Sequence, residues 1–128
     1  INKTVDGSFI LGGTFGSPWN GIGAQPWLLK INSNGTEEWQ YQYGSHNGFY
    51  ANQTNDGGYI LSGNCIDCEG NNAKIIKTDS YGMPIWNRIH NTNTFKFIDQ
   101  VNDGGYIALS GGMILTKTDN KGYSLISY

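Results

Sequence analysis

The sequence predicts an all-β fold built from three copies of one four-stranded unit. Three observations support this prediction: the composition, a repeated aspartate-glycine motif and a repeated lysine-glycine-tryptophan motif. The 128 residues include 19 glycines and 17 aromatic side chains (4 Trp, 8 Tyr and 5 Phe), while charged residues make up only 14%. Abundant glycine together with abundant aromatic residues is typical of strands joined by tight turns. The length suits one domain with a modest core.

The first motif is an aspartate followed by glycine, with an aromatic residue three positions after the aspartate and a short apolar run beyond it. Its copies lie at residues 6–13, 55–63 and 103–111, and their aspartates are separated by 50 and 47 residues. An Asp-Gly pair between two apolar runs indicates a tight hairpin turn. Each copy therefore predicts one hairpin.

The second motif is a lysine, a glycine five residues later and a large apolar residue four residues after that. Trp39 and Trp86 close the first two copies, and they are again 47 residues apart. A period of roughly 40–50 residues with several short strands is typical of β-propeller blades. We therefore predict a single propeller segment of three four-stranded antiparallel blades, at residues 1–48, 49–95 and 96–128. The copies of the motif are Lys30, Gly35 and Trp39; Lys77, Gly82 and Trp86; and Lys117, Gly122 and Ile126.

The middle unit allows each strand to be placed. Apolar and aromatic runs predict strands at 50–54, 59–63, 73–78 and 83–90. They are separated by turns at 55–58 and 79–82 and by a cysteine-containing loop. Pro84 falls at the start of the fourth strand. Because proline cannot donate a hydrogen bond to a sheet, it is tolerated at the start of a strand or at an edge. This position agrees with a meander whose fourth strand is outermost.

The three units differ in length between their second and third strands. The first unit carries its insert at residues 14–26, which we expect to form a surface loop, because loops tolerate insertions that strands do not. In the third unit the same region shrinks to a tight hairpin around Gly111 and Gly112. Variation confined to one region predicts that any binding site lies there.

Both ends of the sequence align within a unit. Ile1 aligns with Ala51 in a first strand, and Tyr128 aligns with Tyr41 in a fourth strand. Propellers close with about four to eight blades, so three blades form an incomplete ring. We expect either a segment of a longer chain or a ring that is closed by association, in which two copies would supply six blades.

Cys65 and Cys68 lie in the loop between the second and third strands of the middle unit. A Cys-x-x-Cys pair can form a local disulfide, remain as free thiols, contribute to a zinc site or act as a redox pair. Zinc would require two more ligands, and a redox pair is expected at the start of a helix, which the sequence does not predict. A small disulfide is the favoured interpretation, and it would suit an oxidising compartment.

A meander places the hairpins between second and third strands on one face, together with the links between units. We call this the variable face. Exposed aromatic side chains among asparagines suit a carbohydrate or a protein surface. Alternatively, Trp19 folds back over its own blade as an anchor. Trp39 and Trp86 recur in register and are predicted to belong to the core. The candidate binding residues are Phe15, Trp19 and Gln25 from the first insert, Asp67 and Glu69 from the cysteine loop, and His46 and Asn93 from the links.

The opposite face carries the uniform turns, and its aspartates have a structural explanation. An aspartate at the start of a turn accepts hydrogen bonds from backbone N–H groups that follow it. A calcium site at residues 119–122 fits poorly, because Lys121 stands where an oxygen ligand would be needed. The aspartates predicted to cap turns are Asp6, Asp56, Asp79, Asp103 and Asp119.

Several functions are disfavoured by the sequence. The net charge is −2 and the basic residues are scattered, so nucleic acid is not an expected partner. No apolar run is long enough for a membrane-spanning helix, and the chain opens without a signal-peptide pattern. Nucleophile elbows, phosphate loops and histidine-rich metal motifs are missing as well. We therefore expect no enzymatic activity, no catalytic residue, no metal and no cofactor in these residues.

The consensus of the units, DGGYIxxG followed by LxKx(D/N)xxGxxxW, resembles the repeats of bacterial secreted β-propeller proteins of the PQQ-like and kelch-like kinds. The third unit departs from the pattern, with Ile126 at the tryptophan position and one extra residue within 106–111. The resemblance covers nearly the whole chain. The second unit matches the consensus at Asp56, Gly57, Gly58, Tyr59, Gly63, Lys77, Asp79, Gly82 and Trp86.

The resemblance implies a secreted or cell-surface protein that acts as a non-enzymatic structural or binding module. Its expected partners are other propeller blades or protein subunits. Two alternatives remain open at this point. One is a lectin-like propeller that binds glycans on the variable face around Trp19. The other is a fragment of a propeller enzyme whose active site lies in other blades, since a quinone cofactor would require a closed ring.

Overall fold

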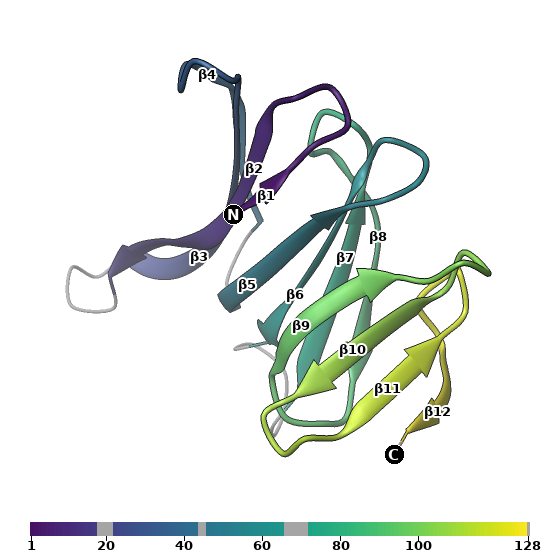
Figure 1. Cartoon of the computed structure of the whole chain (residues 1–128). Coiled ribbons are helices and arrows are strands. Elements are labelled where there is room, and N and C mark those ends of the chain that lie inside the picture. Colours follow the sequence, from purple (N-terminus) through teal and green to yellow (C-terminus); the bar gives the residue numbers. More distant parts are fainter. Residues whose placement is uncertain (18–21, 44–45, 66–71, 128) are drawn as a thin grey trace.

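Twelve strands form three separate four-stranded sheets, and in each sheet the strands follow one another in chain order (Figure 1). The computed structural model describes residues 1–17, 22–43, 46–65 and 72–127, with the description of 15–17, 22–25, 46–49 and 65 limited to the backbone. All strand pairs are antiparallel. These sheets confirm the predicted all-β class and the three four-stranded units. Among the described residues, no strand pairing closes the three sheets into a ring.

The first sheet contains β1 (Asn2–Lys3), β2 (Phe9–Ser17), β3 (Ile22–Ile31) and β4 (Glu37–Gln42). The second sheet contains β5 (His46–Gln53), β6 (Tyr59–Cys65), β7 (Ala73–Thr78) and β8 (Pro84–His90). The third sheet contains β9 (Phe95–Gln100), β10 (Tyr106–Ser110), β11 (Leu115–Thr118) and β12 (Ser124–Ser127). Pro84 begins β8, which is an edge strand of its sheet, as its missing N–H group requires.

The turn between the first two strands of each sheet is closed by its aspartate. In the second sheet, Asp56 Oδ1 accepts a hydrogen bond of 2.9 Å from the N–H group of Gly58. Asp6 and Asp103 accept the equivalent bonds from Ser8 and Gly105. These bonds confirm the predicted caps and explain why the first hairpin recurs with so little change.

The turn between the third and fourth strands follows the same principle. Asp79 Oδ1 accepts hydrogen bonds from the N–H groups of Tyr81 and Met83. Asp119 plays the same role in the third sheet, and Asn32 takes over the role in the first. The predicted capping by Asp79 and Asp119 is therefore confirmed.

Two expectations about the first and second units were wrong. Residues 14–26 do not form a loop throughout, because β2 and β3 extend into the insert, with Phe15 opposite Gln25 in their ladder. Residues added to both sides of a hairpin can pair with each other and so satisfy their own backbone hydrogen bonds. His46 is likewise not in a link between units: it is the first residue of β5 and lies opposite Cys65.

The third sheet contains a bulge in β9, where Lys96 is skipped because Leu109 lies opposite Phe97 and Ser110 lies opposite Phe95. The ladder between β9 and β10 shifts register between Leu109 and Ser110. A β-bulge places two residues of one strand opposite one residue of its partner, so an insertion disturbs only the local pairing. The tight hairpin predicted around Gly111 is confirmed, because the N–H group of Ser110 bonds to the carbonyl oxygen of Ile114.

The core lies between the sheets, in two apolar clusters. Along β6, Tyr59 and Leu61 belong to the cluster between the first two sheets, whereas Ile60 belongs to the cluster between the second and third. Both faces of this strand are therefore buried, which explains why its sequence is a continuous apolar run. The first cluster contains Ile10, Leu28, Tyr43, Ala51, Tyr59, Leu61 and Ile76, and the second contains Ile60, Ala73, Ile75, Phe95, Ile98, Tyr106 and Ala108.

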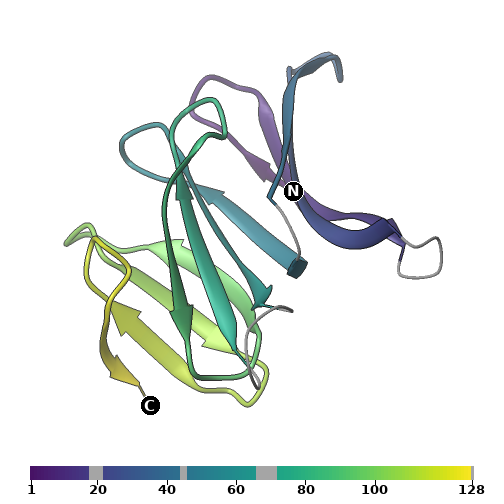
Figure 2. The same cartoon turned by 180° about the vertical axis from the view of Figure 1, so that it is seen from behind.

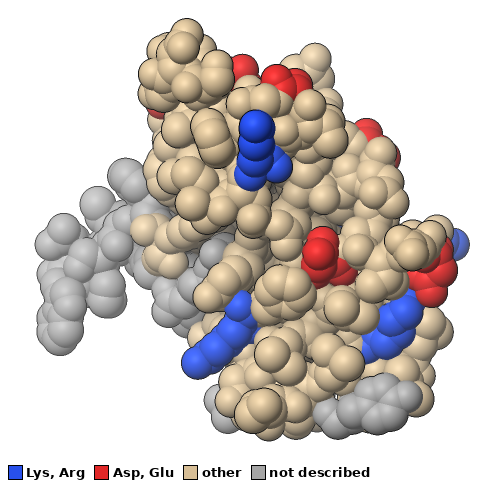
Figure 3. Space-filling view, in the orientation of Figure 1, with Lys and Arg blue, Asp and Glu red and all other residues tan. Residues whose placement is uncertain are grey.

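The three sheets lie side by side in chain order (Figures 1 and 2). Strand β5 contacts both β1 and β9, so the first strands of the three sheets lie next to each other. Figure 3 shows lysine and acidic side chains scattered among uncharged residues on one side of the molecule. Within the described ranges, no helix has the length and apolar character needed to cross a membrane.

Candidate functional site

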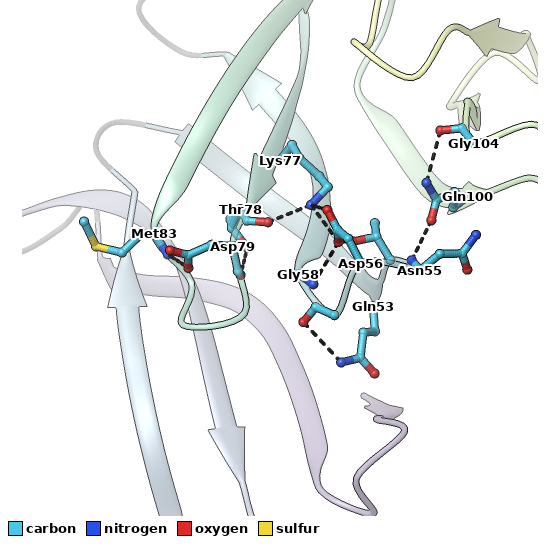
Figure 4. A network of polar contacts seen from close by, with 12 residues as sticks. Gln53, Asn55, Asp56, Gly58, Lys77, Thr78, Asp79, Met83, Gln100 and Gly104 are labelled. Carbon is cyan, nitrogen blue, oxygen red and sulfur yellow. Dashed lines mark hydrogen bonds and ion pairs between the residues drawn. The ribbon is translucent and has the colours of Figure 1, made fainter.

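The lysine and aspartate that recur in each unit form an ion pair within their own sheet. Lys77 is 5% exposed, and its Nζ lies 2.9 Å from Asp56 Oδ2 and donates a bond of 2.8 Å to the carbonyl oxygen of Thr78 (Figure 4). The ammonium group thereby ties the β5–β6 turn to the end of β7. The same ion pair joins Lys30 to Asp6 and Lys117 to Asp103. These lysines and aspartates are part of the framework, so a site must be sought elsewhere.

The electrostatic consequence is clearest at Asp56. Partial burial alone would raise the pKa of its carboxyl group, but hydrogen bonds from Thr54, Lys77 and the Gly58 N–H group outweigh burial. Together they lower the pKa of Asp56 from its ordinary 3.8 to about 2. A carboxylate held in its charged form by these donors is a poor proton donor or acceptor near neutral pH, which supports a structural role.

One pair of side chains repeats wherever two sheets meet. Asn2 Nδ2 donates a hydrogen bond of 2.9 Å to the carbonyl oxygen of Ala51, and Asn52 Nδ2 donates one of 2.7 Å to that of Ile98. These two asparagines occupy equivalent positions in the first and second units. The same kind of bond therefore joins the first sheet to the second and the second sheet to the third, and we call these asparagines forward because each reaches the following sheet.

A glutamine of the following sheet reaches back to the preceding sheet at each place where two sheets meet, which we call a junction. Gln53 Oε1 accepts a bond of 2.9 Å from the N–H group of Val5, and Gln100 Oε1 accepts one of 2.8 Å from that of Asn55 (Figure 4). Each junction thus contains one forward asparagine and one backward glutamine. Sequence reasoning did not find this pair, because a polar residue on a strand carries no indication of which neighbour it reaches.

The tryptophans complete the junctions. Trp39 packs edge-on against Tyr59 of the next sheet, with ring centroids 5.6 Å apart, and Trp86 packs on Tyr106 in the same way at 6.0 Å. Both tryptophans are half-buried between sheets, where each packs against one of the two apolar clusters. The first sheet therefore meets the second as the second meets the third.

We expect Asn52→Ala to lower the free energy of unfolding by about 1 kcal/mol, because one intramolecular hydrogen bond to Ile98 is lost. Urea denaturation followed by circular dichroism measures the change. Asn55→Ala is the matched control, because Asn55 uses its backbone N–H group at the junction. Equal losses in the two variants would show that the forward bond contributes nothing.

Two adjoining clefts are the best candidates for binding. The larger has a volume of about 580 Å³ and is lined by residues of β1, β2, β5 and β9 and of the link before β9, including Tyr50, whose side chain is 54% exposed. The smaller has a volume of about 330 Å³ and is mostly polar. Both clefts share Thr94 and Lys96, so they adjoin each other, and we call the two together the polar groove. The smaller cleft is lined by Asn64, Asn72, Asn93, Thr94, Lys96 and Gly111.

The polar groove lies on the variable face, where the β6–β7 hairpin, the β8–β9 link and the β10–β11 turn meet. Asn93, expected there from the sequence, is one of its lining residues. Lys96 forms no ion pair with any described residue, in contrast to Lys30, Lys77 and Lys117. The groove therefore presents amide groups, one cation and one exposed phenol ring to solvent.

The structure brings only some of the predicted binding residues together. The backbones of Phe15 and Gln25 are opposite one another, as are those of His46 and Cys65. Sequence reasoning missed Tyr50, Asn64, Asn72, Thr94 and Lys96, although Asn64 and Asn72 flank the cysteine loop that it singled out. Trp19, Asp67, Glu69 and Cys68 lie outside the described residues, so the roles given to them and the Cys65–Cys68 disulfide stay predictions.

Metal binding finds no support in the part of the chain that the structure describes. That part contains no group of three His, Cys, Asp or Glu side chains placed to hold an ion. His90 packs edge-on to Phe95 with a ring distance of 5.4 Å, and its burial lowers the pKa of the imidazole. Its contacts give this histidine a packing role.

The stacked four-stranded sheets and their repeated junctions define an all-β repeat protein with an open arrangement of sheets. Its fold is similar to that of a solved protein of unknown function from Bacteroides caccae, with a TM-score of 0.60 and 15% sequence identity. The similarity covers 82% of this chain and 40% of the other, so the chain matches less than half the length of that protein. No family model and no curated protein matches the sequence.

Proposed function

We propose that the three sheets are blades of a β-propeller and that the chain is a non-enzymatic structural and binding module of an exported or cell-surface protein. The observation that supports this most strongly is the repeated junction. Asn2 and Asn52 make the same forward bond, and Trp39 and Trp86 make the same aromatic contact. One repeated relation between successive sheets, with the first strands innermost, is how a propeller is generated.

The distribution of charged groups supports a structural and binding role over catalysis. Asp6, Asp56 and Asp103 are engaged in turn hydrogen bonds and ion pairs. The chain therefore uses its repeated carboxylates to hold the blades, while the polar groove of the variable face is left for a partner.

Fractionation of the source cells with an antibody against residues 1–128 tests the proposed location. We expect the protein in the medium or on the cell surface, and recovery in the cytoplasm alone would contradict the proposal. Unfolding tests the blade arrangement. Tryptophan fluorescence and circular dichroism of the wild-type chain should give one midpoint, because neighbouring blades share their apolar clusters.

A glycan is the second candidate for the binding partner, and the polar groove favours it. Sugar hydroxyl groups pair with amide side chains, and sugar rings stack on exposed aromatic rings. Asn64 and Asn93 supply the amides, and Tyr50 supplies the ring. This arrangement moves the proposed glycan site from Trp19 to described residues of the second and third blades.

We expect Tyr50→Ala to weaken glycan-array binding at least about tenfold, which corresponds to a loss of about 1.4 kcal/mol. The stacking surface would be lost while the fold is kept, because the side chain is 54% exposed. Tyr81→Ala is the matched control, since Tyr81 is 72% exposed on the turn at the opposite face. A chain that binds no glycan but still unfolds cooperatively would contradict the glycan proposal, and only the structural role would remain.

A further inference from the structure

The bulge in β9 sets one lysine apart from the regular ladder of the third sheet. Lys96 is the residue that has nothing opposite it on β10. The second sheet has a register shift at the equivalent place, between Asn47 and Tyr50. A β-bulge changes the direction of a side chain, and bulges are frequent beside functional sites. The irregularity thus recurs in two units whereas the lysine does not, because the equivalent residue of the second unit is Phe49.

Two glycines of the β10–β11 turn make room for polar side chains of the groove. A β-carbon at Gly111 would lie 3.3 Å from Cε of Lys96, and one at Gly112 would lie 3.5 Å from Nδ2 of Asn93. The end of the Lys96 side chain therefore packs on the backbone of the turn. The N–H group of Gly111 also bonds to the carbonyl oxygen of Thr94 at 3.2 Å, which holds the turn against the segment before β9.

The smaller cleft of the polar groove contains a positive charge that no described residue balances. Its volume of about 330 Å³ lies within the range of about 300–1,000 Å³ that is typical of ligand pockets. Lys96 is the one charged residue among its described lining residues, and it forms no ion pair with any described residue. The chain as a whole has a net charge of −2, so the charge of the cleft is opposite to that of the chain. An ammonium group in a cleft attracts an anionic ligand.

The neighbouring groups indicate which kind of anion fits. The amides of Asn64 and Asn93 donate and accept hydrogen bonds and so suit sugar hydroxyl groups, and Tyr50 offers an exposed ring in the adjoining cleft. A carboxylate forms a charge-assisted hydrogen bond with one ammonium group, whereas phosphate groups favour the fork of an arginine. The described lining of the groove supplies one lysine and no arginine. An acidic sugar combines a carboxylate, hydroxyl groups and a ring in one ligand.

We propose that the polar groove binds a glycan that contains hexuronic acid units, and that a carboxylate of this glycan pairs with Nζ of Lys96. The proposal rests on the glycan-binding role proposed above and names the class of sugar. In this arrangement Asn64 and Asn93 bond to sugar hydroxyl groups, and Tyr50 stacks on a sugar ring.

Matched acidic and neutral oligosaccharides test this assignment by isothermal titration calorimetry. The probes are tetramers of galacturonate, glucuronate, mannuronate and guluronate, each compared with the same tetramer after reduction of its carboxyl groups to alcohols. At least one acidic tetramer should bind at least about tenfold more tightly than its reduced counterpart. Lys96→Gln should abolish this preference and leave the affinity for the reduced tetramer unchanged, which also shows that the variant is folded. Raising the salt concentration from about 0.1 to about 1 M should weaken the preference, because the Debye length falls from about 10 to about 3 Å.

Lys121→Gln is the matched control, because Lys121 is exposed on the β11–β12 turn of the opposite face and should leave both affinities unchanged. Equal affinities for acidic and reduced tetramers, or a preference that survives in Lys96→Gln, would overturn the acidic ligand and leave a neutral glycan in the groove. An equal loss of both affinities in Lys96→Gln would give the lysine a structural role and overturn the proposal too. A wild-type chain that binds neither set would contradict the glycan role itself, whereas a single unfolding midpoint in that sample would leave the structural role intact.

Discussion

Gly82→Ala is expected to lower the free energy of unfolding by about 3 kcal/mol. Gly82 has a φ of 83°, a region in which a residue with a β-carbon costs about 1–2 kcal/mol. A β-carbon there would also lie 2.7 Å from Cζ3 of Trp39, so the indole ring would have to move. Overpacking of this kind typically costs about 1–3 kcal/mol. Urea denaturation followed by circular dichroism measures the loss.

Gly35→Ala separates the two contributions. Gly35 has the same φ of 83°, but a β-carbon there would have nothing within 4 Å. Its expected loss is therefore about 1 kcal/mol, which is the backbone contribution alone. Similar losses at both glycines would mean that the tryptophan does not pack tightly on the following turn.

Lowering the pH from about 4 to about 2 is expected to destabilise the protein through its three aspartate–lysine pairs. The pKa of Asp56 is depressed from 3.8 to about 2, so its stabilisation is complete above the ordinary value and is lost as the pH falls through the depressed one. Asp56 contributes about 1 kcal/mol after allowance for a side chain that is 61% exposed. The hydrogen bond from Lys30 lowers the pKa of Asp6, and that from Lys117 lowers the pKa of Asp103.

Urea midpoints measured across this pH range provide the test. Asp56→Asn should be less stable than wild type at pH 7 and should lose less stability on acidification, because it no longer carries the titrating carboxyl group. Glu37→Gln is the control, since Glu37 is an exposed carboxylate without a lysine partner among the described residues. Parallel pH profiles for wild type and Asp56→Asn would show that the pair does not contribute to acid unfolding.

The turns were predictable because their chemistry is local. Asp56 and Asp79 bond to N–H groups only two to four residues away, so the residue types alone indicate the turn. The insert at 14–26 was harder to predict. Its variable length suggested a loop, but backbone pairing extended β2 and β3 into it. Pairing across a hairpin depends on register, which local composition does not reveal.

For the candidate site, the sequence predicted only the face of the molecule and not the residues that line the groove. Variation in length between second and third strands pointed to the variable face, where the polar groove lies, and binding there stays a prediction. The lining residues Tyr50, Asn72 and Lys96 come from β5, the segment before β7 and β9, and they meet only after the sheets pack. Residues separated by 20 or more positions do not reveal such proximity in a single sequence.

The sequence by itself determined the all-β class, the three units and the turns, because the repeated turns are closed by hydrogen bonds between residues that are close in the chain. Only the tertiary structure decided how one unit meets the next. The bond from Asn52 to Ile98 spans 46 residues, and Trp39 reaches Tyr59 of another sheet. Such contacts form because each sheet must bury an apolar face against another sheet. That requirement places the side chains of successive units together.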